Sequence, residues 1–196
     1  MNNNKKKIIN HFDKLSEVRS SWIKKSSGFY SEDIRAMKEF IPDNSRILEI
    51  GCGNGHLIAS LNPSYGLGID ISEGMIKNAK KSYSNIDYIN ADIEDPKTIA
   101  KINGEFDFII ISDTIGYFHD IEKLVNYLHK FCNSDTRLII AYYSPFWEPI
   151  LNFAAKFKFK MPELPKALLN ELDISSILEA SKFQTVKKQN KILFPF

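Results

Sequence analysis

The architecture of this chain can be worked out from one stretch, Arg46-Ile47-Leu48-Glu49-Ile50-Gly51-Cys52-Gly53-Asn54-Gly55-His56. An apolar, β-branched run ends in three glycines at alternate positions, and an apolar segment follows at residues 57–61. This order predicts a strand, a glycine turn and a helix. Glycines let such a turn adopt positive φ and pass close to a ligand, and the free N–H groups of the helix point at whatever binds there.

The spacing of the glycines separates two classes of nucleotide-binding turn. The dinucleotide-binding pattern is G-x-G-x-x-G, and its third glycine would fall at His56. The pattern here is instead E-x-G-x-G-x-G, opened by Glu49. A nicotinamide-dependent dehydrogenase is therefore disfavoured.

Strands and helices alternate through the middle of the chain. The expected strands are residues 46–50, 66–69, 86–89, 106–111 and 137–143. Helices are expected after Ser72 and Asp95 and over residues 120–131, because Ser and Asp are good N-caps. This alternation predicts an α/β fold, a doubly wound and mostly parallel sheet flanked by helices. Right-handed connections bring the carboxyl ends of its strands to one edge, where open sheets bind their ligands.

Polar residues follow the expected strands where the strands end. They are Glu49 with the glycines, Asp70, Asp92 and Ser112-Asp113. Any one of these acids could be an ordinary loop or cap residue, since Asp favours such positions. Their recurrence in register with the glycine turn favours a shared ligand edge instead. Asp70 lies about twenty residues beyond the turn, where an acid typically meets a ribose.

Length and charge bound the class of protein. At 196 residues we expect one domain, 1–196, with an N-terminal helical cap (1–45), a βαβ core (46–144) and acceptor-side helices with terminal strands (145–196). The net charge of +2 gives no indication of a nucleic-acid or acidic-lipid partner.

The cysteines and the N-terminus indicate the compartment. Cys52 and Cys132 make no disulfide framework, so we expect free thiols in a reducing environment. The polar residues 1–7 are not followed by the apolar region of a signal peptide, and no apolar run approaches the ~18 residues of a membrane span. We expect a cytoplasmic protein.

The glycine turn resembles the first motif of the Rossmann-like (class I) S-adenosylmethionine-dependent methyltransferases. Asp70-Ile71-Ser72-Glu73-Gly74-Met75 is similar to the D-x-S-x-x-M of that family. The resemblance implies S-adenosylmethionine as cofactor, with Asp70 on the ribose hydroxyls, Asp92 at the adenine amine and Glu49 at the methionine end. The cofactor-binding set that it implies is Glu49, Gly51, Cys52, Gly53, Asn54, Gly55, Asp70, Ile71, Met75, Asp92, Ile93, Ser112 and Asp113.

A finer resemblance extends from about Tyr30 onward. Residues 113–118, 145–149, 160–163 and 174–186 are similar to a bacterial methyltransferase subgroup often encoded beside or fused to glycosyltransferases. This implies a small-molecule acceptor such as a glycan or lipid precursor, and an association with a glycosyltransferase. It leaves open whether oxygen, nitrogen or carbon is methylated.

Methyl transfer from a sulfonium needs a general base only if the acceptor must lose a proton. His119, just past the fourth strand, is the best-placed candidate, although a surface or capping histidine is the simpler interpretation. Tyr117, Asp113 and His11 are weaker candidates. No spacing among the histidines and cysteines suggests a metal site.

The two ends of the chain carry further expectations. Residues 1–10 are expected to be a frayed tail, and helices are expected over 11–25 and from Ser31. Residues 147–160 interleave aromatics with lysines, which favours an amphipathic helix packed on the domain, with an acceptor lid or lipid-facing surface as the alternative. Residues 184–188 and 191–194 are expected to be a sixth and a seventh strand. Because the chain stops at Phe196, we expect a truncated sheet edge.

Three functions compete. A small-molecule methyltransferase is favoured, and a non-catalytic domain that keeps the fold for binding is the alternative from another class. A nucleic-acid methyltransferase is disfavoured, because residues 112–115 lack the Asn/Asp-Pro-Pro-aromatic motif of amino-methylating DNA enzymes and the chain shows no basic stripe.

Overall fold

A five-stranded parallel sheet forms the centre of the computed structural model, which describes residues 3–157 and 161–190. The strands are β1 (Arg46–Ile50), β2 (Tyr65–Asp70), β3 (Asp87–Asn90), β4 (Phe108–Ser112) and β5 (Arg137–Ala141). Their order is β3-β2-β1-β4-β5, and every neighbouring pair is parallel. The predicted doubly wound α/β sheet is confirmed. The strand order reverses beside β1, which places a ligand crevice at the carboxyl ends of β1 and β4.

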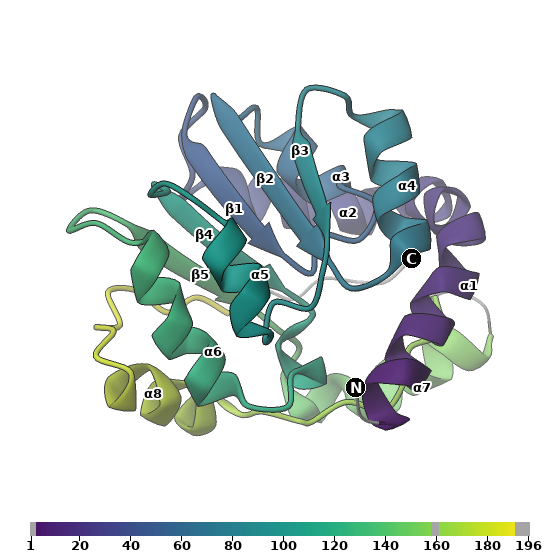
Figure 1. Ribbon diagram of the computed structural model, residues 1–196. Helices are drawn as coiled ribbons and strands as arrows, with labels where there is room; N and C mark the ends of the chain where they lie inside the picture. Colours follow the sequence, from purple (N-terminus) through teal and green to yellow (C-terminus); the bar gives the residue numbers. More distant parts are fainter. Residues whose placement is uncertain (1–2, 158–160, 191–196) are drawn as a thin grey trace.

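Helices cover both faces of the sheet (Figure 1). On one face lie α3 (His56–Ser60) and α4 (Glu73–Ser82), and on the other lie α5 (Pro96–Lys101), α6 (Ile121–Leu128) and α8 (Glu171–Ala180). The alternation of side chains along β1 separates two apolar layers, because Ile47 packs with Ile58 and Ile76 while Leu48 packs with the α5 and α6 side. The strands are thus buried on both faces, as an apolar parallel sheet requires.

The predicted N-caps are confirmed for α4 and α5. The Ser72 hydroxyl accepts the N–H of Met75 at 3.2 Å, and the Asp95 carboxylate accepts that of Lys97 at 2.9 Å. Asp120 caps α6 by accepting the N–H of Lys123 at 3.0 Å. These caps start each helix directly after a strand end, so the loops at the carboxyl edge are short and well defined.

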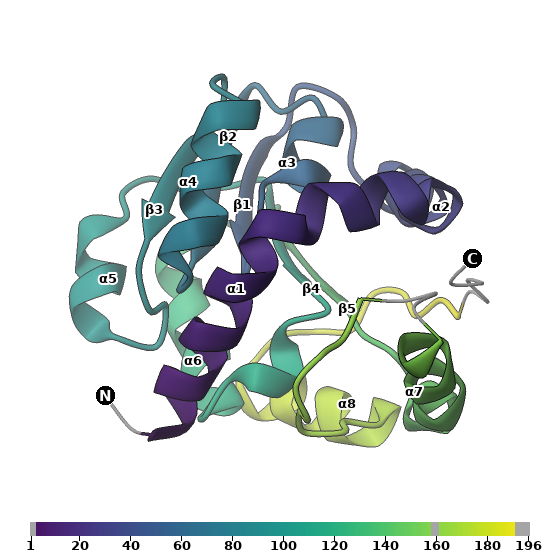
Figure 2. The ribbon, with the colours of Figure 1, turned by 90° about the vertical axis from the view of Figure 1, so that its right-hand side faces the viewer.

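The N-terminal segment differs from the expected frayed tail. Helix α1 (Asn3–Lys25) begins almost at the start of the chain, because Ile8 is buried and Lys5 pairs with two carboxylates. A break at Ser26 separates it from α2 (Ser27–Lys38), which begins earlier than the expected Ser31. Figure 2 shows α1 crossing in front of α4 and passing into α2.

The C-terminal segment corrects two expectations. Residues 184–188 are not a strand, since Val186 is 77% exposed and Lys188 pairs at 2.9 Å with Glu171 of α8, away from the sheet. The expected strand at 191–194 lies outside the described residues. Helix α7 (Glu148–Lys156) forms within the expected 147–160 helix, of which residues 158–160 lie outside the described residues. Its aromatic side does not pack on the domain, because Phe153 is 62% exposed.

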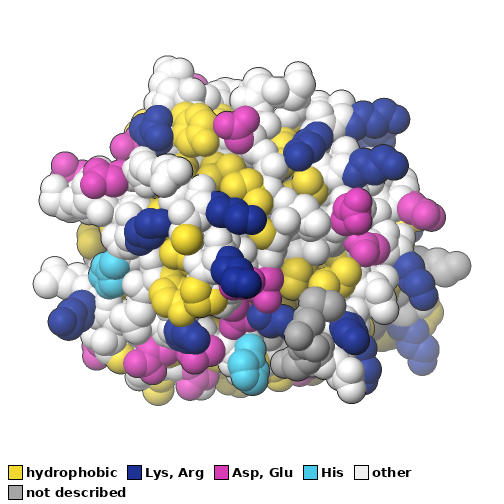
Figure 3. Space-filling view, in the orientation of Figure 1, with side chains coloured by type: hydrophobic (Ala, Val, Ile, Leu, Met, Phe, Trp, Pro, Cys, Tyr) yellow, Lys and Arg dark blue, Asp and Glu magenta, His cyan; other side chains and the backbone are white. Residues whose placement is uncertain are grey.

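Short 3-10 turns lie at both ends of the sheet. At the carboxyl edge, η1 (Ile115–Tyr117) follows β4 and η3 (Pro145–Trp147) follows β5, whereas η2 (His129–Phe131) ends α6 and lies beside the start of β4. On the face drawn in Figure 3, Lys and Arg side chains are interspersed with Asp and Glu. This mixed surface agrees with the small net charge of +2.

Candidate functional site

A cavity of about 200 Å³ lies at the carboxyl ends of the strands, under α1 and α2. The predicted set lines it, apart from Gly55: Glu49, Gly51, Cys52, Gly53, Asn54, Asp70, Ile71, Met75, Asp92, Ile93, Ser112 and Asp113. Residues from strands far apart in the sequence therefore meet at one place, as the parallel topology predicts.

The three glycines of the turn have different reasons to be glycine. All have positive φ, at 73° for Gly51, 53° for Gly53 and 76° for Gly55. A Cβ on Gly51 would lie 2.4 Å from Thr114, and one on Gly55 would lie 2.2 Å from the Tyr88 hydroxyl. A Cβ on Gly53 would have nothing within 4 Å, although this residue lines the cavity. Gly51 and Gly55 thus allow Thr114 and Tyr88 to pack against the turn, and Gly53 leaves room for a ligand against the backbone.

Asp70 ties the end of β2 to the glycine turn. Its carboxylate accepts the N–H of Gly53 and the N–H of Ser72, each at 2.8 Å. Burial raises the pKa of Asp70, and these two backbone hydrogen bonds oppose the rise. An ionised carboxylate offers about four acceptor sites, so Asp70 can still accept hydrogen bonds from a ligand in the cavity.

Glu49 holds the turn from the other side. It is only 3% exposed, and its Oε2 accepts the N–H of Ile58 in α3 at 3.1 Å. Burial raises the pKa of Glu49 to about 8, and the nearby Asp33 contributes to the rise. Burial thus favours the protonated form of the Glu49 carboxyl group.

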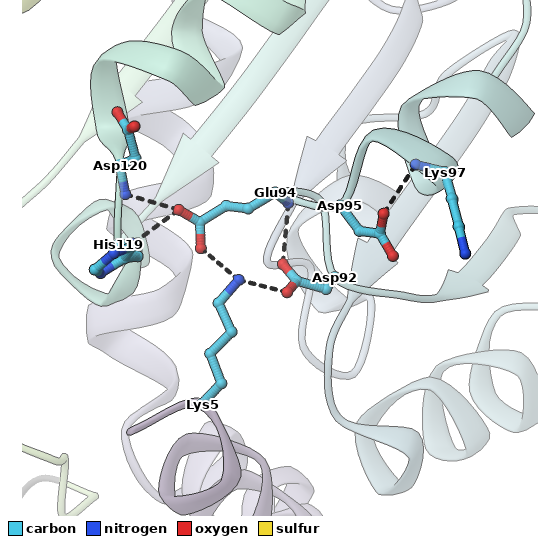
Figure 4. Close-up of polar contacts among 7 residues, drawn as sticks. All are labelled: Lys5, Asp92, Glu94, Asp95, Lys97, His119 and Asp120. Carbon is cyan, nitrogen blue, oxygen red and sulfur yellow. Dashed lines mark hydrogen bonds and ion pairs between the residues drawn. The ribbon is translucent and has the colours of Figure 1, made fainter. Parts of the chain in front are cut away.

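Asp92 belongs to an ion-pair network that joins three segments (Figure 4). Lys5 of α1 pairs with Asp92 and, at 2.8 Å, with Glu94. Glu94 also accepts the backbone N–H groups of His119 and Asp120, both at 2.8 Å. Lys5 thereby fastens α1 over the loops that follow β3 and β4.

Lys5 was missed by the sequence analysis, which placed it in a frayed tail. The available signal was the spacing of Ile8, Phe12 and Leu15, which extends the amphipathic pattern of the expected helix back toward Lys5.

Asp33 and Arg19 are two further cavity residues that sequence reasoning did not find. Burial raises the pKa of Asp33 to about 7, and the charge of Asp113 adds to the effect. The Arg19 guanidinium lies 5.4 Å from the centre of the Tyr30 ring and donates to the Met161 sulfur at 3.6 Å. No local motif distinguishes these side chains, because each sits on a helix among other charged residues.

The structure does not bring His119 into the cavity. Its side chain is exposed and only its backbone N–H takes part in the Glu94 network. Of the weaker candidates, Tyr117 and Asp113 line the cavity and His11 does not. His56 also lines it and lies 3.1 Å from the Tyr83 hydroxyl. Among the described residues, no group of three or more His, Cys, Asp or Glu side chains could hold a metal ion.

The class of protein now follows from the geometry: a Rossmann-like fold with a nucleoside-sized cavity at its switch point. A family model described as a methyltransferase domain matches residues 22–187. The chain therefore belongs to the family of S-adenosylmethionine-dependent methyltransferase domains of the Rossmann-like class.

Curated relatives with sequence similarity include two malonyl-[acyl-carrier protein] O-methyltransferases. The protein from Acetivibrio thermocellus is 31% identical over 163 residues, which is 74% of this chain and 56% of the relative. The protein from Priestia megaterium is 29% identical over 140 residues, which is 64% of this chain and 46% of the relative. The chain thus spans about half the length of these relatives.

Solved structures share the fold at low sequence identity. A possible histamine N-methyltransferase from Thermotoga maritima is similar with a TM-score of 0.72, 18% identity and coverage of 90% of this chain and 81% of the other. Magnesium protoporphyrin IX methyltransferase from Synechocystis PCC 6803, with bound S-adenosylhomocysteine, is similar with a TM-score of 0.70 and 17% identity. The match covers 98% of this chain and 95% of the other. Within the described residues, we find no helix with the length and apolar character that crossing a membrane would require.

Proposed function

We propose that this chain transfers the methyl group of S-adenosylmethionine to a small-molecule acceptor. The single observation that carries the proposal is the convergence of Gly53, Asp70 and Asp92 on one cavity. The residues fit the cofactor in two respects: Gly53 leaves open space against the backbone, and two acids that could accept hydrogen bonds from the ribose diol and the adenine amine line the same cavity.

Each end of the cavity has a distinct task in this proposal. Asp70 would accept the ribose hydroxyls and Asp92 the adenine amine, while Ile71 and Met75 would flank the base. At the other end, Glu49 and Asp33 would face the positive charges of the cofactor's methionine part, and Arg19 its carboxylate. The bound cofactor supplies an already activated methyl group.

The protein's own contribution is alignment and exclusion of water. Helix α1 covers the cavity through Ile8, Phe12 and Ile23, which line it with apolar surface. Holding the acceptor in line with the methyl group lets proximity and orientation lower the barrier.

The acceptor itself is a separate question. The malonyl-[acyl-carrier protein] O-methyltransferases carry their acceptor in their name, but this chain spans only part of their length. A glycan or lipid precursor, an association with a glycosyltransferase and a cytoplasmic location stay predictions from the sequence.

Calorimetric titration with S-adenosylmethionine and S-adenosylhomocysteine tests the proposal. Asp70→Ala should weaken binding by about 100-fold, because hydrogen bonds to a charged group contribute about 1.5–3 kcal/mol each. Gly53→Ala should also weaken it by filling the open space, with the domain still folded. Asp43→Ala, on an exposed loop away from the cavity, is the matched control and should bind like the wild type.

Two outcomes would redirect the assignment. Absence of binding by a folded wild-type chain would contradict the proposal and leave a non-catalytic domain. Tight binding of DNA or RNA that weakens steeply with salt would bring back the nucleic-acid methyltransferase.

A further inference from the structure

Helix α7 presents a row of exposed apolar side chains on its outer side. The row begins in η3, whose helical backbone runs directly into α7, and its members are Phe146, Ile150, Phe153 and Phe157. At 3.6 residues per turn, this spacing keeps them within about 60° of one another around the helix axis. The exposed fraction is 92% at Phe146 and at least 48% at the other three. We call this row the α7 face.

The opposite side of α7 faces the domain. Leu151 and Ala155 line a cavity of about 240 Å³ together with residues 161–169. These two residues lie about half a turn away from the α7 face. Figure 2 shows α7 at the outer edge of the molecule. A helix that only packs on a domain has a polar outer side, so the apolar α7 face is more than the fold itself requires.

The size of the α7 face separates a lipid surface from a protein partner. Three partly exposed phenylalanines and one isoleucine present roughly 500 Å² of apolar surface. A stable protein interface, that of a dimer of this chain included, buries about 800 Å² on each partner and contains about one hydrogen bond per 100–200 Å². The α7 face is smaller and has no polar side chain. Insertion into lipid requires only a few apolar anchors beside basic residues.

Positive charge accompanies the α7 face. Lys156 is exposed on α7, next to Phe157 and one turn from Phe153. In the sequence, residues 145–160 contain three lysines and a single acid, Glu148, and this excess equals the net charge of the whole chain, +2. The charge of the chain is thus concentrated in the segment that carries the exposed rings. Anionic headgroups attract such basic residues, and aromatic rings insert below the headgroups.

We propose that the α7 face docks the protein on the surface of an anionic lipid bilayer. The rings of Phe153 and Phe157 would enter the boundary between headgroups and acyl chains, and the Lys156 ammonium would stay at the level of the headgroups. The helix would lie in the plane of the surface without crossing the bilayer. This inference is independent of the proposed methyl transfer, because none of these side chains lines the cofactor cavity.

Vesicle flotation with the full chain tests the inference. One set of vesicles is phosphatidylcholine alone, and the other is equal parts phosphatidylcholine and phosphatidylserine. The protein should bind the second set at least about tenfold more tightly, since each lysine near an anionic surface contributes about 1 kcal/mol. Binding to the second set should weaken as the salt concentration rises, because ions screen this attraction.

A double variant locates the apolar contact. Phe153→Ser combined with Phe157→Ser should weaken binding to the phosphatidylserine vesicles at least about tenfold, because two rings no longer leave water. Val18→Ser combined with Val186→Ser removes two exposed apolar side chains elsewhere and should bind like the wild type. Urea unfolding should be the same for the double phenylalanine variant and the wild type, which excludes misfolding as the cause.

A charge reversal locates the basic contact. Lys156→Glu should weaken binding to the phosphatidylserine vesicles at least about fivefold. Lys77→Glu makes the same change of charge at an exposed position of α4, and it should leave binding close to that of the wild type.

A tryptophan reporter measures insertion. The emission of Phe153→Trp, taken as the difference from the wild-type spectrum, should shift to shorter wavelength on phosphatidylserine vesicles and be quenched by brominated lipid. Leu172→Trp, at an exposed position of α8, should show neither change.

Three results would overturn the inference. The first is absence of binding to the phosphatidylserine vesicles at low salt. The second is equal binding by the double phenylalanine variant, which would place the contact outside the α7 face. The third is self-association of the wild type in sedimentation velocity that the double variant abolishes, which would assign the face to a second copy. None of these results bears on cofactor binding, which the titration with S-adenosylmethionine tests separately.

Discussion

At the end of the cavity that we assign to adenosine, Glu94 accepts hydrogen bonds from Lys5 and from two backbone N–H groups. At the end that we assign to the methionine part, Asp33 instead lies close enough to Asp113 and Glu49 for the charges of these groups to act on one another. Burial acts on both carboxyl groups. The hydrogen bond and charge of Lys5 nevertheless bring the pKa of Glu94 below its usual value, whereas the pKa of Asp33 rises to about 7.

The two ends therefore respond to acid in opposite directions. The stabilisation from Glu94 is complete above its unfolded pKa of about 4.5 and is lost as the pH falls through its lower folded value. The ionised form of Asp33 is unfavourable in the fold, so stability declines as the pH rises from about 3.8 to about 7. The end at Glu94 thus contains its own cation, Lys5, whereas the charge that raises the pKa of Asp33 further is that of another acid, Asp113.

The largest expected effect tests the end of the cavity that contains Asp33. Asp33→Asn should raise the free energy of unfolding at pH 8 by up to about 4 kcal/mol, because about three pKa units of unfavourable ionisation disappear. The gain should shrink toward zero near pH 4. Urea unfolding at pH 4, 6 and 8 measures it. The exposed neighbour Glu32, as Glu32→Gln, is the matched control and should change stability by less than about 0.5 kcal/mol.

An equal gain at every pH would break the comparison, because it would show that the Asp33 carboxyl is not forced to ionise in the fold. The same variant also tests ligand binding. If Asp33→Asn weakens the binding of S-adenosylmethionine more than that of S-adenosylhomocysteine, the Asp33 carboxylate interacts with the sulfonium charge, which only S-adenosylmethionine carries.

The next effect tests the end of the cavity that contains Glu94. Lys5→Met should lower the free energy of unfolding by about 2 kcal/mol, since it leaves Asp92 and Glu94 side by side without their shared cation. It should also speed release of S-adenosylhomocysteine in stopped-flow measurements, because α1 loses a fastening over the cavity. Lys6→Met, exposed on the same turn, is the control. Unchanged release and stability would mean that Lys5 does not fasten α1.

The smallest effect concerns backbone strain at the methionine end. Asp113 has a φ of 58°, which few residues other than glycine adopt easily. Asp113→Gly should stabilise the fold by no more than about 1 kcal/mol and should lower methyl transfer. Asn44→Gly relieves a similar φ of 65° away from the cavity, and it should stabilise the fold without touching transfer. Full transfer activity in Asp113→Gly would show that the Asp113 carboxylate is not needed for methyl transfer.

The sheet and most of the site were predictable because their signals are local. The strand ends at Glu49, Asp70 and Asp92 sit next to apolar runs in the sequence, and parallel topology then brings them to one edge. Helix caps such as Ser72 were predictable for the same reason, since a cap acts within its own turn.

What could not be predicted depends on contacts between distant segments. Nothing local separates Asp33, which lines the cavity, from its neighbour Glu32, which is exposed and pairs with Arg35. Lys5 pairs with Asp92, 87 residues away, and with Glu94. The prediction of a sixth strand was wrong because a local signal was present without its distant partner. Residues 184–188 have an acceptable strand composition, but Lys188 bonds to α8 and the segment pairs with no described strand.

The way in which α1 is anchored has a consequence for biosynthesis. The Asp13 carboxylate of α1 accepts hydrogen bonds from the Ser72 hydroxyl at 2.6 Å and from the Gly74 N–H at 3.0 Å, and Lys5 of α1 pairs with Asp92. At about 5–20 residues per second, the ribosome makes these partners several seconds after α1. Helix α1 therefore cannot complete these contacts until residues 72–92 have emerged. Until then, the glycine turn and Asp70 lack the helix that covers the cavity.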